Sequence, residues 1–263
     1  MKILTTDEIK DELIEKIRSK KINNKLIIVS QGPNDEGIAY KNFLVKRSIA
    51  FNIAYEYKNF ENNVPKEEIL DYLNSQSKDD GFIIIMPFAN NEYLPFLRDE
   101  ILIKDLDGFT YRSQGRVMAG IFDSLPATSK AIARTITKFS EIKKKSITLA
   151  NSTNLIGLPL ALYLSKNGAT VSIMNSSTKN PVELVKNSDI FISAIGKANY
   201  FDKKYFRDGQ LLIDVGSSVV NGMVIGDIDY ENLEDLDVNV ITHKKGIGAI
   251  TTLSLIESLI SKE

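Results

Sequence analysis

The feature that most constrains the fold is a short apolar run that leads through a small-residue loop into a helical pattern. The run is Ser146-Ile-Thr-Leu-Ala150, the loop is Asn151-Ser-Thr-Asn-Leu-Ile-Gly-Leu-Pro159, and the helical pattern continues from Leu160 to Lys166. Proline is tolerated in the first turn of a helix, where its missing N–H costs nothing. A buried strand, a loop with glycine and a helix are typical of a nucleotide-binding turn, in which N–H groups at the helix start attract phosphate. Gly157 is expected to let the backbone approach a ligand closely, although the G-x-G-x-x-G fingerprint is absent.

Strand and helix patterns alternate along the whole chain, which predicts the α/β class with a doubly wound parallel sheet in the second half. The expected strands cover residues 26–29, 53–57, 81–86, 146–150, 170–174, 189–194, 210–215 and 237–242. The expected helices cover residues 5–17, 39–51, 65–73, 127–139 and 160–166, with a final amphipathic helix at 250–260. A tight polar turn is expected at Asp105-Leu-Asp-Gly108.

The length of 263 residues, with 43% hydrophobic residues, favours two domains. We expect a first domain at residues 1–125 and a Rossmann-like second domain at 126–249. The final helix, within residues 250–263, is expected to pack back on the first domain.

The composition indicates that the protein binds a small molecule. Lys+Arg 33 against Asp+Glu 34 give a formal net charge of -1, so no overall field recruits nucleic acid or an anionic membrane. The absence of cysteine excludes disulfides, thiolate metal sites and a cysteine nucleophile, and a single histidine argues against a zinc site. We therefore expect no metal, no nucleic-acid partner and no membrane segment, and a cytoplasmic location.

Several separated segments resemble, in their order and spacing, the motifs of the FolD family, the methylenetetrahydrofolate dehydrogenase/cyclohydrolases. The resemblance spans most of the chain. Its motifs D-x-D-G, G-R, G-R-S-x-x-V-G-x-P, H-S-x-T, I-D-V-G-I-N and G-D-V-D correspond to Asp105–Gly108, Gly115–Arg116, Asn151–Pro159, Asn175–Thr178, Ile213–Ser218 and Gly226–Asp229.

This resemblance implies a two-lobed fold in which the first lobe handles a tetrahydrofolate-type substrate and the second binds NAD(P). It implies Tyr40 and Asp107 as catalytic residues, with Asp107 anchoring the pterin through hydrogen bonds to its carboxylate. It implies a homodimer. The implied cofactor-binding residues are Asn151, Ser152, Thr153, Gly157, Ser176 and Ser217.

The first half departs from the family pattern at the position of the catalytic lysine. The family's Y-x-x-x-K places tyrosine and lysine on one helix face, but Leu44 stands four residues after Tyr40. Lys46 lies at the wrong angle for that face, and Arg47 stays charged, so it cannot act as an acid-base catalyst near neutrality. The glutamine of Q-L-P-L-P is replaced by Ile85.

A loop near the C-terminus departs as well. The family's P-V-P-G-G-V-G-P-M-T corresponds to Thr242-His-Lys-Lys-Gly-Ile-Gly-Ala-Ile-Thr251, which keeps its glycines and final threonine and loses its prolines. His243 could serve as a substitute acid or base, but a solvated histidine at a strand end is the simpler interpretation.

These losses bear unequally on the family's two reactions. Hydride transfer from the methylene carbon leaves a cation that the substrate nitrogen stabilises, so it needs no protein base. Hydrolysis of that cation needs a positioned acid or base, which accelerates such steps by typically ~10²–10⁴. We expect the dehydrogenase step to be kept and the cyclohydrolase step to be weak or lost. The full bifunctional reaction and a non-catalytic cofactor-binding paralogue are the alternatives.

The expected cofactor is NADP, with NAD possible. The second strand of the Rossmann-like domain leads into Asn175-Ser-Ser-Thr178, with no Asp or Glu to hold the ribose hydroxyls of NAD. The family's arginine is also absent, since Ser152 takes its place. Hydroxyls and Lys179 form a weaker clamp for a 2′-phosphate than a guanidinium does.

Overall fold

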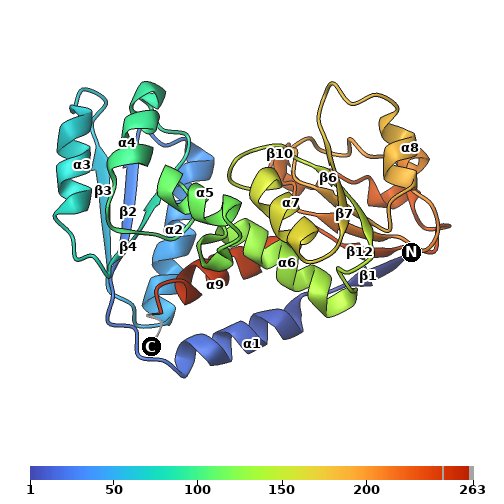
Figure 1. Ribbon diagram of the computed structural model, residues 1–263, viewed down its shortest axis with the longest axis horizontal. Helices are drawn as coiled ribbons and strands as arrows, with labels where there is room; N and C mark the ends of the chain where they lie inside the picture. Colours follow the sequence, from blue (N-terminus) through green and yellow to red (C-terminus); the bar gives the residue numbers. More distant parts are fainter. Residues whose placement is uncertain (245, 261–263) are drawn as a thin grey trace. The chain divides into compact units, whose positions relative to one another are not determined.

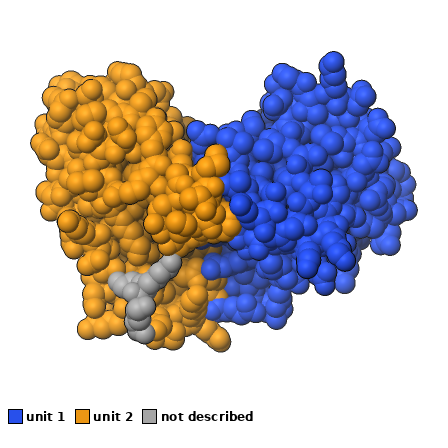
Figure 2. Space-filling view, in the orientation of Figure 1, with its two compact units in different colours: residues 1–12, 128–251 blue, residues 13–127, 252–263 orange. Residues whose placement is uncertain are grey.

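The computed structural model describes residues 1–244 and 246–260 of the chain (Figure 1). It has two compact units (Figure 2). Unit 1 comprises Met1–Glu12 and Thr128–Thr251, and unit 2 comprises Leu13–Ala127 with the described residues from Thr252 onwards. The expected α/β class with parallel sheets is confirmed. The division of the chain differs from the predicted first domain at residues 1–125, because Met1–Glu12 belong to unit 1.

Unit 2 is built on a four-stranded parallel sheet with the strand order β3-β2-β4-β5. The strands are β2 (Leu26–Gln31), β3 (Tyr55–Phe60), β4 (Gly81–Ile84) and β5 (Lys104–Asp105). Every residue of β2 and β4 is buried, as expected for central strands covered on both faces. The helices are α2 (Asp35–Ala50), α3 (Lys66–Asn74), α4 (Leu94–Glu100) and α5 (Tyr111–Met118), with 3-10 turns η1 (Asn91–Tyr93) and η2 (Phe122–Ser124).

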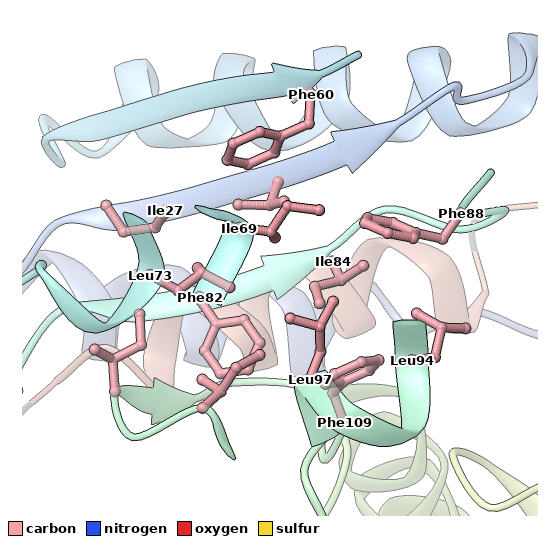
Figure 3. Packing of buried hydrophobic residues seen from close by; sticks show 13 residues of the cluster. Ile27, Phe60, Ile69, Leu73, Phe82, Ile84, Phe88, Leu94, Leu97 and Phe109 are labelled. Atoms are coloured by element: carbon pink, nitrogen blue, oxygen red, sulfur yellow. The ribbon is translucent and has the colours of Figure 1, made fainter. Parts of the chain in front are cut away.

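The core of unit 2 lies between the sheet and the helices α3 and α4. Figure 3 shows side chains from β2, β4, α3 and α4 meeting in one apolar layer. Phe82 and Phe109 pack edge to face with their ring centroids 6.2 Å apart, and Leu73 and Leu97 are fully buried. This layer fixes the strands from whose ends the loops of the site emerge.

Helix α2 begins earlier than the sequence pattern predicts. Asn34 adopts an extended conformation, and its side-chain Oδ1 accepts a hydrogen bond from the N–H of Gly37 at 2.8 Å. Asparagine is a favoured N-cap because this bond satisfies an otherwise unpaired N–H of the first turn. The helix therefore starts at Asp35 and not near residue 39, which adds one turn before Tyr40.

Unit 1 is built on a six-stranded parallel sheet with the order β1-β12-β9-β8-β6-β7. Its strands are β1 (Lys2–Leu4), β6 (Ser146–Ala150), β7 (Thr170–Met174), β8 (Ile190–Ser193), β9 (Leu211–Asp214) and β12 (Asn239–Ile241). The short strand β1 pairs with β12, which explains why the start of the chain belongs to this unit. The core of the sheet is aromatic, with Phe191 and Phe201 packed edge to face at 4.8 Å.

The connections of unit 1 are helices and one hairpin. The hairpin pairs β10 (Ser218–Val220) with β11 (Met223–Ile225) and exposes apolar side chains. The helices are α6 (Ala127–Phe139), α7 (Gly157–Lys166) and α8 (Pro181–Lys186), with 3-10 turns η3 (Lys203–Tyr205) and η4 (Tyr230–Asn232). The divisions between the units fall within α1 (Asp7–Arg18), at the first residue of α6 and within α9 (Ile247–Glu257).

The helix α9 differs from the amphipathic helix that we expected. Nearly all of its side chains are buried, including Leu253, Ser254 and Leu255 on different faces. Hydroxyl-bearing residues can be buried in a helix because they bond to backbone carbonyls of the preceding turn. Thr251 Oγ1 donates such a bond to the Ile247 carbonyl at 3.1 Å. The threonine and serine positions that resembled a polar face therefore belong to the interior.

No helix in the described part of the chain has the length and apolar character needed to cross a membrane.

Candidate active site

The loop after β6 is organised by the side chain of Asn151. Its Oδ1 accepts hydrogen bonds from the N–H of Thr153 (2.9 Å), the hydroxyl of Thr153 (2.8 Å) and the N–H of Gly157 (3.0 Å). Its Nδ2 donates to the carbonyl of Ala194, directly after β8, at 2.6 Å. Asn151 thus shapes the loop and ties it to the next strand. The exposed Ser152 side chain takes part in none of these four hydrogen bonds.

Gly157 is needed by the loop itself. A Cβ at this position would lie 1.9 Å from the carbonyl oxygen of Asn151, a distance no side chain tolerates. The sequence predicts that this glycine allows the backbone to approach a ligand closely. The structure shows a second reason for glycine at this position, because its missing side chain lets the loop close on its own backbone.

The start of α7 offers fewer phosphate donors than the sequence predicts. The N–H groups of Gly157, Leu158 and Leu160 are hydrogen-bonded within the loop and helix, and Pro159 has none. The positive end of the helix dipole still faces the loop, and the exposed Ser152 adds a hydroxyl donor. The N–H groups of Gly157, Leu158 and Leu160 are therefore not free to bind a phosphate at this turn.

The turn after β7 presents hydroxyls and no carboxylate. Asn175 Oδ1 accepts from the N–H of Ser177, and Thr178 Oγ1 accepts from the N–H of Asn175, both at 2.9 Å. These two bonds close the turn. Ser176 and Lys179 are exposed beside it, so the turn can offer a hydroxyl and an ammonium to a ligand that lies over the end of β7.

The end of β9 carries a fully buried carboxylate, Asp214. Oδ1 accepts from the N–H groups of Gly216 and Asp227, each at 3.0 Å. Oδ2 accepts from the N–H of Ile228 at 3.1 Å and from the hydroxyl of Tyr230. Burial raises the pKa of Asp214 to about 6, against the hydrogen bonds of these donors, which favour the ionised form. Asp214 is therefore a carboxylate near neutral pH.

A second buried carboxylate, Asp227, connects the segment after β11 to the end of β8 and the loop that follows it. It accepts from the hydroxyl of Ser193 at 2.6 Å and from the N–H groups of Ile195 at 2.8 Å and Lys197 at 2.7 Å. A Cβ at Gly216 would lie 2.1 Å from Cγ of Asp227, so only glycine fits there. The predicted cofactor residue Ser217 follows this glycine and is exposed.

His243 is more enclosed than the solvated histidine that the sequence suggests. Its ring stacks on Tyr230 with centroids 6.0 Å apart and planes at 20°. Its Nε2 lies 3.0 Å from the carbonyl oxygen of Val224. Its Nδ1 is buried without a hydrogen-bond partner, and burial lowers the pKa of the ring. His243 is therefore a neutral, half-buried side chain with its proton on Nε2.

Topology gives these loops a common edge. The carboxyl ends of β6, β7, β8, β9 and β12 lie at one edge of the sheet because the strands are parallel. From β6 the chain moves outward to β7 and then returns to β8 on the other side, which makes a switch point between β6 and β8. Dinucleotides bind outside the carboxyl ends of strands at such a point.

In unit 2, the structure brings Tyr40 and Asp107 within electrostatic reach of each other. Tyr40 is half-buried on α2, and burial raises the pKa of its phenol, with the negative charge of Asp107 as the second cause. Asp107 follows β5, and its Oδ1 accepts from the N–H of Ala127 at 3.1 Å. The carboxylate of Asp105 fixes the loop by accepting from the N–H of Asp107 at 3.1 Å and the N–H of Thr110 at 2.7 Å.

Leu44 and Ile85, which stand where the family motifs have lysine and glutamine, are both apolar and fully enclosed. Leu44 is 0% exposed and Ile85 is 1% exposed. A Cβ at Gly37, one turn before Tyr40, would lie 3.0 Å from a methyl group of Ile85, so Ile85 packs against the start of α2. Arg47, three residues after Leu44 on this helix, has its guanidinium 5.1 Å from the ring of Phe43.

The predicted cofactor residues lie in the loops after β6, β7 and β9, and the structure gives two of them, Asn151 and Gly157, roles within the loop itself. The sequence did not predict the Asp214, Asp227 and Tyr230 hydrogen-bond network, although Gly226-Asp-Ile-Asp229 belongs to one of the quoted motifs. The adjacent buried Asp and glycine in that motif were the available signal. Within the described part of the chain, no group of three or more acidic or histidine side chains could hold a metal ion.

Unit 1 has the features of a Rossmann-like dinucleotide-binding domain, and unit 2 those of a second parallel α/β domain with a polar loop after its edge strand. Residues 126–263 match a family model described as "Tetrahydrofolate dehydrogenase/cyclohydrolase, NAD(P)-binding domain". The chain is 30% identical over 259 residues to "Bifunctional protein FolD" of Picrophilus torridus, covering 97% of this chain and 92% of that protein.

The fold is shared with solved members. A methylenetetrahydrofolate dehydrogenase-cyclohydrolase from Trypanosoma brucei, complexed with NADP cofactor and inhibitor, superposes with a TM-score of 0.88 at 19% identity, over 98% of this chain and 95% of that one. The bifunctional enzyme from Thermoplasma acidophilum gives 0.86 at 23% identity, over 98% and 97%. The chain belongs to the tetrahydrofolate dehydrogenase/cyclohydrolase family, known as FolD, as its motifs predicted.

Proposed function

We propose that this protein oxidises 5,10-methylenetetrahydrofolate, or a similar pterin-bound methylene unit, to the methenyl form with NADP, and has little or no cyclohydrolase activity. The observation that carries the second part is the enclosed apolar pair Leu44 and Ile85, of which Leu44 lies on the helix face that holds Tyr40. Family membership supports the first part.

The side chains that remain suit hydride transfer. The bound nicotinamide supplies a hydride acceptor, and the substrate loses one hydride from its methylene carbon while its nitrogen lone pair stabilises the cation. No proton leaves the substrate in this step. Tyr40 and Asp107 hold the pterin, and the chain's main task is to orient the donor carbon.

Hydrolysis is accelerated by a positioned base, which these side chains do not provide. Water must attack the methenyl carbon and lose a proton, and a positioned base accelerates this by typically ~10²–10⁴. Burial and Asp107 raise the pKa of Tyr40, so its phenol stays protonated at neutral pH and is a poor base. Leu44 and Ile85 have no titratable atom. Hydrolysis should therefore proceed near its spontaneous rate.

NADP is the proposed cofactor because the residues around the β7 turn fit a 2′-phosphate better than a ribose diol. Ser176 and Lys179 are exposed at this turn, Ser152 is exposed in the loop after β6, and the turn has no carboxylate to bind the ribose hydroxyls. A carboxylate there would also repel a 2′-phosphate. One mobile ammonium gives less selectivity than an arginine, so we expect a modest preference over NAD.

The test is an assay of nicotinamide reduction by the purified protein with methylenetetrahydrofolate, run with NADP and NAD side by side. Turnover with a higher kcat/KM for NADP is expected. Equal or better kcat/KM with NAD would contradict the cofactor assignment, and no turnover with either would support the non-catalytic paralogue instead.

We also propose, from the family resemblance, that the protein forms a homodimer. The mass of the purified protein in solution, measured by light scattering, should be twice 29.4 kDa. A mass equal to one chain at all concentrations would contradict this.

A further inference from the structure

His243 contacts Val224 and Tyr230, and each of these residues is connected through hydrogen bonds or strand pairing to the turn after β9. Its Nε2–H donates to the carbonyl of Val224 on β11, at 3.0 Å. A carbonyl accepts only, so this bond fixes the neutral tautomer with the proton on Nε2. Its ring also stacks on Tyr230, and its own backbone N–H lies 3.4 Å from the Tyr230 hydroxyl.

The first connection runs through Tyr230. The hydroxyl of Tyr230 donates to Oδ2 of Asp214, and Oδ1 of Asp214 accepts from the N–H of Gly216 at 3.0 Å. The Tyr230 hydroxyl is the one side-chain donor described for this carboxylate, beside three backbone N–H groups, so the position of its ring affects how Asp214 is held. That carboxylate in turn orients the peptide that enters Gly216, the residue before Ser217.

The second connection runs through the hairpin. Val224 pairs with Val219 in the register of β10 and β11, and β10 begins at Ser218. Since His243 holds the carbonyl of Val224, it restrains the strand that pairs with the residues directly after Ser217. Both connections end at the same short turn.

Gly226 makes this arrangement possible. A Cβ there would lie 2.0 Å from Oδ2 of Asp214 and 2.7 Å from Nδ1 of His243. The two polar atoms thus converge on the space beside the Gly226 Cα. The side chains form one packed group, which we call the β9 clamp: Asp214, Gly226, Tyr230 and His243.

The β9 clamp lies on one side of the switch point. In dinucleotide-binding folds, the adenosine ribose is recognised at the end of the strand that follows the first crossover, which here is β7. The ends of β8, β9 and β12 lie on the opposite side of β6, so their loops are left for the nicotinamide half.

We propose that His243 is a positioning residue for the nicotinamide half of the cofactor, acting through Tyr230 and Asp214 on the Gly216–Ser217 turn. This inference rests on the proposed NADP-binding function. It assigns His243 no proton transfer, because the side chain acts on the protein's own turn.

The experiment compares two ligands on the full-length protein by titration calorimetry. NADP occupies both halves of the site, whereas 2′,5′-ADP carries only the adenosine half with its 2′-phosphate. His243→Phe keeps a ring for Tyr230 but removes the donor to Val224. Tyr230→Phe keeps the stacking but removes the hydroxyl that bonds to Asp214. His243→Gln keeps an N–H donor at the place of Nε2.

Loss of one such hydrogen bond changes affinity by roughly tenfold. We expect His243→Phe and Tyr230→Phe each to weaken NADP by about that factor and to leave 2′,5′-ADP unchanged. His243→Gln should recover most of the NADP affinity. Asn232→Ala, which removes an exposed bond to Asp229 in the same 3-10 turn, is the matched control and should change neither ligand.

Unchanged NADP affinity in both phenylalanine variants would overturn the inference. So would an equal loss for both ligands, which would mean that His243 only stabilises the domain. Wild-type protein that binds neither ligand would overturn the proposed function, a result that is distinct from either outcome in the variants.

Discussion

Tyr40 and Leu44 lie one helical turn apart on α2, and the first is half-buried while the second is completely buried. Residues at this spacing lie on one helix face. The face that holds Tyr40 therefore continues into the apolar interior of unit 2, at the position where the family motif has its lysine. In the proposed function, this relationship affects the two reactions of the family differently, because hydrolysis calls for a titratable acid or base and hydride transfer does not.

The double variant Leu44→Lys with Ile85→Gln should gain hydrolysis of methenyltetrahydrofolate. A lysine in this enclosed position has a lowered pKa and can accept a proton near neutrality, and a glutamine can hydrogen-bond to it. We expect the rate to rise by roughly 10², the lower range for a positioned base. The decay of the methenyl absorbance measures it.

Ile49→Lys supplies the control, since it adds the same charge to α2 at a side chain that is 65% exposed. It should leave hydrolysis at the spontaneous rate. A folded double variant, verified by circular dichroism, with no more hydrolysis than Ile49→Lys would contradict the role assigned to position 44.

Asp107→Asn should weaken substrate binding and leave the fold intact. Asparagine keeps an oxygen that can accept from the N–H of Ala127, but it loses the charge that would bind the pterin N–H groups. Hydrogen bonds to a charged group contribute about 1.5–3 kcal/mol, so KM for the folate substrate should rise by roughly tenfold to a hundredfold. Steady-state kinetics measures this, and an unchanged KM would remove Asp107 from the substrate site.

Gly157→Ala should destabilise the loop after β6. The added Cβ would lie 1.9 Å from a backbone oxygen, so the loop must move, at a cost of about 2 kcal/mol. Urea unfolding measures it. Gly248→Ala, in α9 with open space around its Cα, should instead be neutral or stabilise by up to about 1 kcal/mol. Equal stability of the two variants would show that the glycine of the loop is not needed for its closure.

Asp214 should make stability depend on pH in a defined direction. Burial raises its pKa from 3.8 to about 6, so the folded state binds the proton more tightly than the unfolded state. This stabilisation is complete below the unfolded value and is lost as the pH rises through about 6. The shift corresponds to about 3 kcal/mol.

The free energy of unfolding of wild-type protein relative to Asp214→Asn should therefore fall by about 3 kcal/mol between acidic and neutral pH. Denaturant titrations across that interval measure the difference, and contributions shared by the two proteins cancel. A difference that stays constant over the interval would show that the carboxylate titrates at the same pH in both states.

The sequence predicts the central strands well because their burial is continuous. β2 begins with the apolar run at residues 26–29 and β4 contains another at residues 82–84, and all residues of both strands are buried. β1 could not be predicted in this way. It has three residues, of which Lys2 and Ile3 are exposed, and it exists because Lys2 pairs with Asn239 at the other end of the chain. Pairing over such a distance leaves no local pattern.

The site shows the same limit. Motif order indicated the loops that contain Asn151, Asp107 and Asp214, since the glycines and carboxylates recur at fixed spacing. The enclosure of His243 could not be predicted, because its contacts come from Tyr230 and Val224, which are distant in sequence. Nor could the bonded N–H groups at the start of α7, which depend on how the Asn151 side chain turns.

The central claim is that oxidation survives while hydrolysis does not, and the most direct measurement is the product formed from methylenetetrahydrofolate and NADP. The account predicts that each NADPH formed is matched by one methenyltetrahydrofolate, which then disappears at the rate seen without protein. Stoichiometric 10-formyltetrahydrofolate, formed as fast as NADPH appears, would contradict it.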